Sequence, residues 1–304
     1  MLHESNGRGG GVYSRRFPRS AIRVSIAYQG IAGAWSHLAC SAVHPQREAI
    51  PCATFEDVFE IVEAGRADLA MIPIENNLGG RVADIHQLLP HQALHIVAEY
   101  FQPIRHDLLA VPGATFEGLK AVYSHPQALA QCRRYLRERG LEPRAASDTA
   151  AAAERVAQRG DPSIGAIASA LAGELYQLNS LGRDIQDAQH NTTRFIVLAR
   201  EKNTGPADPD TGYITSLWFQ LRSVPAALYK ALGAFATNNV NLTKLESYIG
   251  TENFDRARFY VEVEGHESDS PVLSALEEIE YYTDIVRVLG SFPQHEFRRQ
   301  RNKP

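Results

Sequence analysis

The chain has 304 residues, of which 44% are hydrophobic and 22% charged, and its formal net charge is -4 at pH 7. These values are typical of a soluble globular protein of about two domains, and the scattered arginines argue against a nucleic-acid partner. No apolar run reaches the roughly 20 residues that a membrane-spanning helix requires, and the first residues lack the apolar stretch of a signal peptide, so a cytoplasmic location is predicted.

Taken in chain order, residues 1–22 hold four glycines and four arginines with little apolar periodicity, which predicts a disordered leader. From residue 23, short apolar runs alternate with helical patterns. This rhythm indicates βαβ units and a mainly parallel sheet over residues 23–200. The predicted strands are 24–28, 69–74, 95–100, 107–111, 121–124, 164–167 and 195–199, and the predicted helices are 54–64, 82–89, 128–139 and 149–158.

A second domain is predicted over residues 212–291, after a linker at 201–211 that is rich in proline, glycine and acidic residues. Its expected order is strand, helix, strand, strand, helix, strand, which is the ferredoxin-like βαββαβ order. The segments are 214–221, 226–238, 242–248, 258–264, 271–279 and 284–289. Residues 292–304 are basic and polar, and we expect them to form a frayed tail.

Four polar loops follow predicted strands of the first domain, where open α/β folds bind their ligands. The first covers residues 28–37. Gly30 and Gly33 allow the backbone to pass close to a ligand, ahead of a helix whose free N–H groups favour anions. Glycines at such joints also occur for turn geometry alone, so this loop is weak evidence by itself.

The second loop covers residues 73–81 and contains Glu75, Asn76 and Asn77. The two asparagines could be simple turn residues. Together with the carboxylate, however, they supply more donors and acceptors than a turn requires. This density of polar groups favours a binding site.

The third and fourth loops are residues 124–127 and 191–195. In the third, Pro126 is suited to the first position of a helix, and His125 is as well explained by capping as by a functional role. In the fourth, Arg194 suits bidentate capture of a carboxylate, and the hydroxyl of Thr193 can both donate and accept a hydrogen bond.

The order and spacing of these motifs resemble those of the prephenate dehydratases. The motifs are Pro73-Ile74-Glu75-Asn76, Ser124-His125-Pro126-Gln127 and Asn191-x-Thr193-Arg194-Phe195. The segments 241–247 and 259–266 are similar to the ACT regulatory domain of the same enzymes. The resemblance covers roughly residues 24–293, and several motifs in one order are more specific than any of them alone.

The resemblance implies a two-lobed α/β catalytic region, similar to type II periplasmic binding proteins, followed by a ferredoxin-like ACT domain. Lobe one would comprise residues 23–99 and 186–200, and lobe two residues 100–185, with the active site between them. Thr193 matches the threonine assigned to catalysis. The expected substrate-binding residues are Arg194, Asn76, Glu75, Ser124, Gln131, Ser36 and Phe195.

The implied reaction converts prephenate to phenylpyruvate with loss of carbon dioxide and water, and it needs neither a cofactor nor a metal. In the family, ACT domains pair and bind phenylalanine at their joint, so a homodimer or homotetramer regulated by L-phenylalanine is expected. The expected allosteric residues are Ala226, Ala227, Leu228, Asn241, Leu242, Glu246 and Ser247.

Departures from the common family pattern keep alternatives open. Many members read Gly-Thr-Phe-Ser where this chain reads Gly33-Ala34-Trp35-Ser36, and alanine there is more similar to arogenate dehydratases. Arogenate is therefore the second candidate substrate. In the ACT segment, Ala226 replaces a glycine, and Tyr248-Ile249 replaces Arg-Pro, which bears on control by phenylalanine.

An alternative of another class is a non-catalytic protein that senses an amino acid. Retention of Thr193 argues against it, because a sensor needs no hydroxyl at the leaving-group position. Cys40, Cys52 and Cys132 form no CxxC pair, so we expect reduced, packed thiols rather than disulfides or a zinc site.

Overall fold

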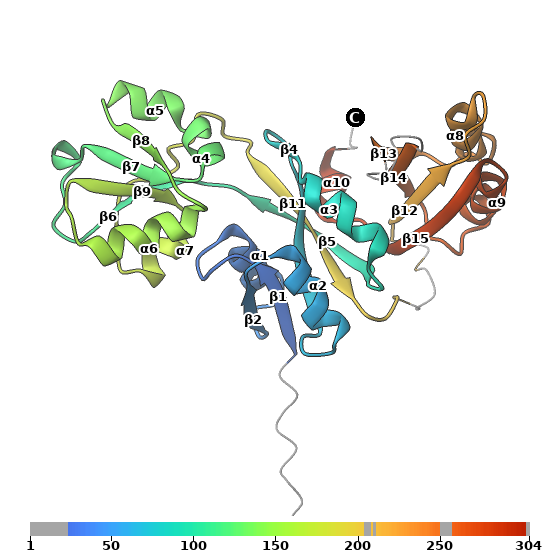
Figure 1. The fold of residues 1–304 in the computed structure, drawn as a ribbon, viewed down its shortest axis with the longest axis horizontal. Coiled ribbons are helices and arrows are strands. Elements are labelled where there is room, and N and C mark those ends of the chain that lie inside the picture. Colours follow the sequence, from blue (N-terminus) through green and yellow to red (C-terminus); the bar gives the residue numbers. More distant parts are fainter. Residues whose placement is uncertain (1–23, 204–207, 209–210, 250–256, 302–304) are drawn as a thin grey trace, which may run out of the picture.

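The computed structural model describes residues 24–203, 208, 211–249 and 257–301, in which three β-sheets lie in a row (Figure 1). The predicted leader at 1–22 lies outside the described residues, as do parts of the predicted linker and the end of the predicted tail. Among the described residues, no helix is long and apolar enough to span a membrane.

The first sheet forms lobe one, with the strand order β2-β1-β3-β11-β5 and the short β4 paired to β3. Its strands are β1 (Ser25–Gln29), β2 (Glu48–Cys52), β3 (Leu69–Asn76), β4 (Gly80–Arg81), β5 (His95–Pro103) and β11 (Thr192–Ala199). One face packs against α1 (Trp35–Val43), and the other packs against α2 (Phe55–Glu63) and α3 (Ala83–Leu88).

The second sheet forms lobe two, with the order β10-β6-β9-β7-β8. Its strands are β6 (Asp107–Ala110), β7 (Ala121–Ser124), β8 (Glu142–Ala145), β9 (Ile164–Ala168) and β10 (Asn179–Gly182), and its helices are α4 (Pro126–Gln131), α5 (Arg133–Glu138), α6 (Thr149–Arg159) and α7 (Ala170–Leu175). The helix predicted over 128–139 is thus two short helices that meet at Cys132. Strand β5 continues past residue 99, so the chain leaves the first sheet after Pro103.

The prediction of a mainly parallel sheet is wrong, because both sheets are mixed. Strand β1 is parallel to β2 and β3, but β11 is antiparallel to both β3 and β5. In lobe two, β6 is antiparallel to β9 and β10. Strand β5 takes the chain out of lobe one and β11 brings it back, so these neighbours run in opposite directions. Periodicity identifies a strand but not its direction.

The third sheet has the order β13-β14-β12-β15 with every pairing antiparallel. Its strands are β12 (Tyr213–Leu221), β13 (Leu242–Ile249), β14 (Ala257–Glu264) and β15 (Thr283–Pro293), and its helices are α8 (Ala227–Thr237) and α9 (Ser270–Ile279). These elements follow the predicted ferredoxin-like βαββαβ order, and we call them the ferredoxin-like domain. The helices cover one face of the sheet.

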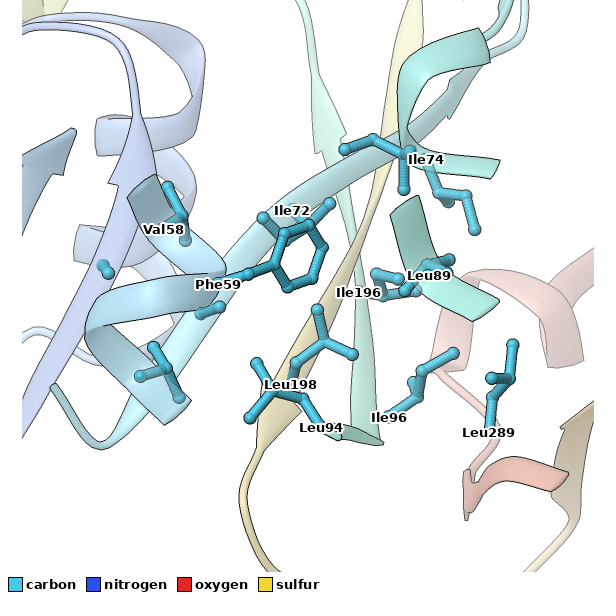
Figure 2. Close-up of a cluster of buried hydrophobic side chains, with 14 of the residues drawn as sticks. Val58, Phe59, Ile72, Ile74, Leu89, Leu94, Ile96, Ile196, Leu198 and Leu289 are labelled. Atoms are coloured by element: carbon cyan, nitrogen blue, oxygen red, sulfur yellow. The ribbon is translucent and has the colours of Figure 1, made fainter. Parts of the chain in front are cut away.

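The other face of this sheet shares a hydrophobic core with lobe one. Figure 2 shows the core continuing from Phe59 on α2, across Ile196 on β11, to Leu289 on β15. Gly290 approaches Ile96 so closely that an added Cβ would lie 2.1 Å from the Ile96 carbonyl oxygen. A large apolar interface of this kind holds two domains in one arrangement.

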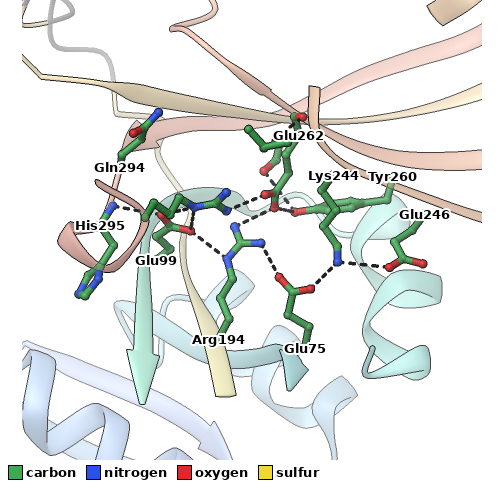
Figure 3. A network of polar contacts seen from close by, with 12 residues as sticks. Glu75, Glu99, Arg194, Lys244, Glu246, Tyr260, Glu262, Gln294 and His295 are labelled. Atoms are coloured by element: carbon green, nitrogen blue, oxygen red, sulfur yellow. Dashed lines mark hydrogen bonds and ion pairs between the residues drawn. The ribbon is translucent and has the colours of Figure 1, made fainter. Parts of the chain in front are cut away.

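A largely buried group of charged side chains, which we call the ion cluster, also joins the two units (Figure 3). At its centre, Arg194 on β11 contacts Glu99 at 2.8 Å, Glu75 at 3.0 Å and Glu262 on β14 at 2.7 Å. The remaining pairs are Arg298 with Glu99 and Glu262, Lys244 with Glu75 and Glu246, and Arg81 with Glu246. The four carboxylates are thereby matched by four cations.

The prediction of a frayed tail is wrong for its described part. Strand β15 extends to Pro293, and helix α10 (Glu296–Arg301) follows it. Arg298 pairs with the fully buried Glu99 and Glu262, and Phe297 stacks on Phe101 with ring centroids 4.6 Å apart. Basic residues that look solvated in the sequence are ordered here because they neutralise buried carboxylates.

The ion cluster predicts how the stability of the protein depends on pH. Burial alone would raise the pKa of Glu262, but Arg194 and Arg298 outweigh burial and lower it from 4.5 to about 2. A carboxyl with a depressed folded-state pKa stabilises the fold above its unfolded pKa, and this contribution is lost as the pH falls toward the folded value. We expect Glu262 to contribute about 3 kcal/mol, lost between about pH 4.5 and about pH 2.

Urea unfolding across this pH range, in wild type, Glu262→Gln and Glu60→Gln, measures the effect. Glu60 is the matched control because its pair with Arg66 is exposed. Glu262→Gln should be less stable at neutral pH and lose less stability on acidification, whereas Glu60→Gln should follow wild type. Equal pH slopes for all three proteins would contradict the assignment.

Candidate active site

A cavity of about 240 Å³ lies between the two lobes, and we call it the interlobe pocket. Lobe one lines it from the loop after β1, the start of α1 and the ends of β3 and β11. Lobe two lines it from His106, the start of α4 and the start of α6. The polar lining residues are Gln29, Trp35, Ser36, Asn76, His106, His125, Gln127, Gln131, Asp148, Thr149 and Thr193.

The two lobes touch at one side of this pocket. Ser169 Oγ, at the start of α7, donates to the Gly33 carbonyl at 2.8 Å, and the Tyr176 hydroxyl donates to the Ala32 carbonyl at 2.9 Å. Gly33 has φ +89°, and a Cβ there would lie 2.9 Å from Ala172 Cα. Glycine is therefore required both for the backbone angle and for the close approach of the lobes.

A β-bulge decides which side chains face the pocket. Strand β11 pairs Thr193 with Asn76 and Arg194 with Glu75, but the next pair is Phe195 with Pro73, which leaves Ile74 without a partner. Ile74 and Glu75 therefore both face the ferredoxin-like domain, and Asn76 turns into the pocket. In a regular strand, alternation from Pro73 would have put Glu75 in the pocket instead.

A chain of hydrogen bonds with a defined direction crosses the pocket wall. The Asn76 side-chain oxygen accepts from the backbone N–H groups of Leu78 at 3.0 Å and Gly79 at 2.7 Å. Asn76 Nδ2 must therefore donate, and it reaches Asn191 Oδ1 at 2.8 Å and Thr193 Oγ1 at 3.0 Å. Two backbone donors thus set the donor-to-acceptor direction of this whole series of hydrogen bonds.

The same direction continues into lobe two. Asn191 Nδ2 donates to Gln131 Oε1 at 2.9 Å, and His106 Nε2 lies 2.9 Å from the same oxygen. Because that oxygen only accepts, His106 carries its proton on Nε2. Burial lowers the pKa of His106, although its bond to Gln131 acts in the opposite direction, so the ring is neutral near pH 7.

The Thr193 hydroxyl occupies a favourable position for catalysis. It accepts from Asn76, and within the described residues no acceptor lies within hydrogen-bond distance of its proton. The hydroxyl is therefore oriented and free to donate into the pocket. Gln131 Nε2 is likewise without an acceptor among the residues described, so it offers a second neutral donor from the other lobe.

Two of the predicted substrate-binding residues face away from the pocket. Arg194 is only 2% exposed and is surrounded by three glutamates on the side of the ferredoxin-like domain. Glu75 lies on the same side because of the bulge. The structure therefore places neither Arg194 nor Glu75, both predicted to bind substrate, in the interlobe pocket. Instead, the ion cluster uses both of them.

Two further residues that were predicted to bind substrate also lie outside the lining of the interlobe pocket. Ser124 is fully buried, and its hydroxyl donates to the Ile167 carbonyl at 2.6 Å, which ties β7 to β9. Phe195 is packed in the core with Tyr28 and Met71. Motif matching selects every residue of a motif. Phe195 lies on the same face of β11 as Thr193, but two residues further along the strand, where α1 and the sheet form a packed core instead of the pocket. By contrast, the pocket does bring together Thr193, Asn76, Gln131 and Ser36.

The sequence interpretation missed His106 and gave Asn191 no specific role. His106 directly precedes β6, and Asn191 directly precedes β11, so each stands at a strand end that faces the pocket. Position at a strand end could have suggested both residues. Trp35, whose ring lies edge-on to that of His106 at 5.6 Å between centroids, forms an apolar wall.

The start of helix α1 offers backbone donors to the pocket. Its N-cap is Ala34, which has no side chain able to cap the first turn, and Ala34, Trp35 and Ser36 all line the pocket. The N–H groups of a first helical turn have no partner inside the helix, and the helix dipole favours an anion there. This helix end is therefore suited to a carboxylate.

The predicted allosteric residues lie at opposite ends of the ferredoxin-like sheet. Ala226, with φ +60°, Ala227 and Leu228 line a surface hollow at the start of α8. Asn241 and Leu242 line a different cavity, of about 390 Å³, beside the ion cluster. Within one chain, the structure does not bring these two groups together.

Glu246 and Ser247, both expected to be allosteric residues, make different contacts in the structure. Glu246 pairs with Lys244 and Arg81 in the ion cluster, and only the backbone carbonyl of Ser247 is engaged, by Arg81 at 3.1 Å.

The described part of the chain contains no group of three or more potential metal-ligating His, Cys, Asp or Glu residues. Cys40, Cys52 and Cys132 are buried free thiols, as predicted.

Comparison with known proteins agrees with this architecture. The family profile named Prephenate dehydratase matches residues 26–203. A solved prephenate dehydratase from Arthrobacter aurescens, in complex with L-Phe, is 31% identical and superposes with a TM-score of 0.82, covering 90% of this chain and 91% of the other.

Two curated relatives extend the comparison. A bifunctional N-acyl-homoserine lactone acylase/prephenate dehydratase from Komagataeibacter europaeus is 45% identical, over 90% of this chain and 98% of the relative. Arogenate dehydratase/prephenate dehydratase 2 from Arabidopsis thaliana is 42% identical, over 89% and 73%. The chain therefore belongs to the prephenate dehydratase family and is a dehydratase, an enzyme of the lyase class, in phenylalanine biosynthesis.

Proposed function

We propose that the interlobe pocket binds prephenate and converts it to phenylpyruvate, carbon dioxide and water. The observation that carries this proposal is the Thr193 hydroxyl, which Asn76 orients at 3.0 Å while its proton remains available to a ligand. A cytoplasmic location remains a prediction.

In the proposed reaction, the bond between the ring and its carboxylate breaks, carbon dioxide leaves, and the electron pair enters the ring. The bond between the ring and its hydroxyl oxygen breaks as the ring becomes aromatic. The departing hydroxide takes one proton from solvent and leaves as water. Thr193 donates a hydrogen bond to this oxygen, so its effect is greatest in the transition state, where negative charge develops there.

The substrate carboxylates are held by neutral donors in this proposal. No described residue that lines the pocket is an arginine or lysine. The N–H groups at the start of α1 and the side-chain amide of Gln131 are the donors proposed to hold them. A neutral site does not stabilise the ring carboxylate as an ion pair would, and this favours its loss as carbon dioxide.

Arogenate is a second candidate substrate, and Asp148 favours it. Asp148 lines the pocket and caps α6, with its Oδ1 accepting from the Ala151 N–H at 2.8 Å. Arogenate carries an ammonium in place of the keto group of prephenate, and a carboxylate without a matching cation in the pocket suits it. Ala34 and the similarity to the Arabidopsis relative support the same alternative.

The acylase activity named for the Komagataeibacter relative is not extended to this chain. A hydroxyl nucleophile is usually activated by a hydrogen-bonded histidine. In the described lining of the interlobe pocket, no serine or threonine hydroxyl is hydrogen-bonded to a histidine.

We also propose that L-phenylalanine regulates the enzyme at a joint between two copies of the chain. The two groups of expected allosteric residues lie at opposite ends of one sheet, so a second copy is needed to bring them into one site. Strand β13 is an edge strand, and Leu245 on it and Tyr229 on α8 are 43% and 81% exposed. An unpaired strand edge and exposed apolar side chains on the same domain support a homodimer or homotetramer.

The first prediction for this function concerns Thr193. Thr193→Ala should lower kcat for prephenate by about 10²-fold or more with little change in KM, since the lost hydrogen bond belongs to the transition state. Thr193→Ser keeps a hydroxyl and should lose far less. Steady-state kinetics of phenylpyruvate formation measures both. A Thr193→Ala enzyme within a few-fold of wild type would refute the role.

The second prediction distinguishes the substrates through Asp148. Asp148→Asn retains an oxygen to cap α6 but removes the negative charge. If arogenate is a substrate, its kcat/KM should fall about tenfold, because a charge-assisted bond to the ammonium is lost. The value for prephenate should stay constant or rise. Equal changes for the two substrates would exclude Asp148 as the ammonium partner.

The third prediction concerns phenylalanine. Wild type should bind L-phenylalanine with loss of activity, and a coupling of about 1–3 kcal/mol would change affinity between the sites by 5–150-fold. Ala226→Gly should bind it more tightly, because glycine adopts the left-handed φ of +60° without strain and has no methyl group. Calorimetric titration beside an activity assay tests this, with D-phenylalanine as control. If L-phenylalanine produces neither binding heat nor inhibition in either protein, the ferredoxin-like domain does not have this regulatory role.

A further inference from the structure

The polar residues of β3 and β11 point to two opposite faces of the sheet. Asn76 and Thr193 face the interlobe pocket, and their chain neighbours Glu75 and Arg194 face the ferredoxin-like domain. Each outer residue is one peptide unit from an inner one. A displacement of an outer side chain that shifts its backbone therefore moves a pocket residue as well.

The outer residues are held by neighbouring strands of the ferredoxin-like domain. Lys244 on β13, 12% exposed, contacts Glu75 Oε2, and Glu262 on β14, fully buried, contacts Arg194 Nη2 at 2.7 Å (Figure 3). Arg194 and Lys244 together lower the pKa of Glu75 despite the opposing effect of its burial. Glu75 is therefore ionised and attracted to both cations.

The two attachments are not equally firm. Arg194 contacts three carboxylates and is 2% exposed. Glu75 has a side chain that is 30% exposed, and it sits beside the bulge residue Ile74, where the β3–β11 ladder is interrupted. Beyond the bulge, the end of β3 is held by two residue pairs with β11, by two with β4, and by the contact of Glu75 with Lys244.

We propose that Lys244 is a positioning residue of the dehydratase reaction, which acts from the ferredoxin-like domain through Glu75 on Asn76 and Thr193. This inference rests on the proposed function. Lys244 holds Glu75, Glu75 fixes the strand end that carries Asn76, and Asn76 orients the Thr193 hydroxyl. The ferredoxin-like domain thus completes the active site as well as carrying the expected regulatory residues.

The same contact supplies a physical link for regulation. Lys244 lies on β13 between Leu242 and Glu246, and it also contacts Glu246 at 3.2 Å. A ligand that binds at the start of β13 would change the position of Lys244, and with it the orientation of Asn76. Such a link requires no movement of the shared hydrophobic core.

Lys244→Met removes the charge and keeps a long, unbranched side chain, and Lys244→Arg keeps the charge. The control is Lys202→Met, because Lys202 also pairs with the ferredoxin-like domain, with Glu267 at 3.2 Å, but it lies beyond Ala199, where β11 ends, and so at the opposite end of that strand from Thr193. We expect Lys244→Met to lower kcat for prephenate about 10-fold to 10²-fold with KM within about threefold, as for a small misplacement of a catalytic group. Lys244→Arg should recover most of this loss, and Lys202→Met should match wild type.

A second measurement does not depend on turnover. Hydrogen exchange of the peptide 69–80 in the full chain, which contains β3, should be faster in Lys244→Met than in wild type or Lys202→Met, because the end of β3 loses an attachment. A purely structural role would lower thermal stability and leave kcat per folded enzyme unchanged, and that result would overturn the proposal.

The assays separate this proposal from the proposed function. If wild type turns over neither prephenate nor arogenate, the proposed function fails, and the exchange rates alone decide whether Lys244 positions the strand. If wild type is active but Lys244→Met keeps both its kcat and its exchange rates, the positioning role fails and the function stands.

Discussion

The pairing of β3 with β11 is the constraint on which the active site and the domain arrangement both depend. The one-residue bulge at Ile74 reverses the faces to which the following residues of β3 point. Asn76 therefore joins Thr193 in the pocket, and Glu75 joins Arg194 at the interface with the ferredoxin-like domain. Because these pairs are adjacent along the chain, the geometry of the pocket and the docking of the third sheet are mechanically connected. In a regular strand, Glu75 instead of Asn76 would face the pocket.

The two faces of this sheet differ in the kind of polar group that they carry. On the outer side, four carboxylates and four cations are matched in a largely buried cluster, since an unpaired charge there would cost several kcal/mol. On the inner side, amides, a hydroxyl and a neutral histidine supply hydrogen bonds without net positive charge. Matched charges select one docking geometry, and oriented neutral donors select one hydrogen-bond direction.

The shared core explains why the ion cluster can be so deeply buried. Ile96, Leu289 and Phe292 pack together across the interface, and Gly290 removes the last side chain that would separate the strands. This contact excludes water from Glu99 and Glu262, which strengthens their attraction to Arg194 and Arg298. Helix α10 closes the same region, so Arg298 contributes to the surroundings of β11.

By itself, the sequence determined the family, most of the strands and helices, and the βαββαβ order of the second domain. These follow from local periodicity and from motifs that are contiguous along the chain. It also predicted Thr193, Asn76, Gln131 and Ser36 as site residues, and the structure places these four in the lining of one pocket. The mixed direction of the sheets and the ordered helix α10 were not predictable in this way.

Only the tertiary structure decided what Arg194 and Glu75 do. A sequence motif treats Thr193-Arg194-Phe195 as one unit. Alternation separates Arg194, in the ion cluster, from the other two, and position along the strand separates Thr193, in the pocket, from Phe195, in a hydrophobic core. The bulge that turns Asn76 inward has no signature in the residues themselves, because it depends on how two strands separated by more than a hundred residues pair. The physical reason is that local pattern specifies the conformation of a strand, whereas long-range pairing specifies which of its faces meets the ligand.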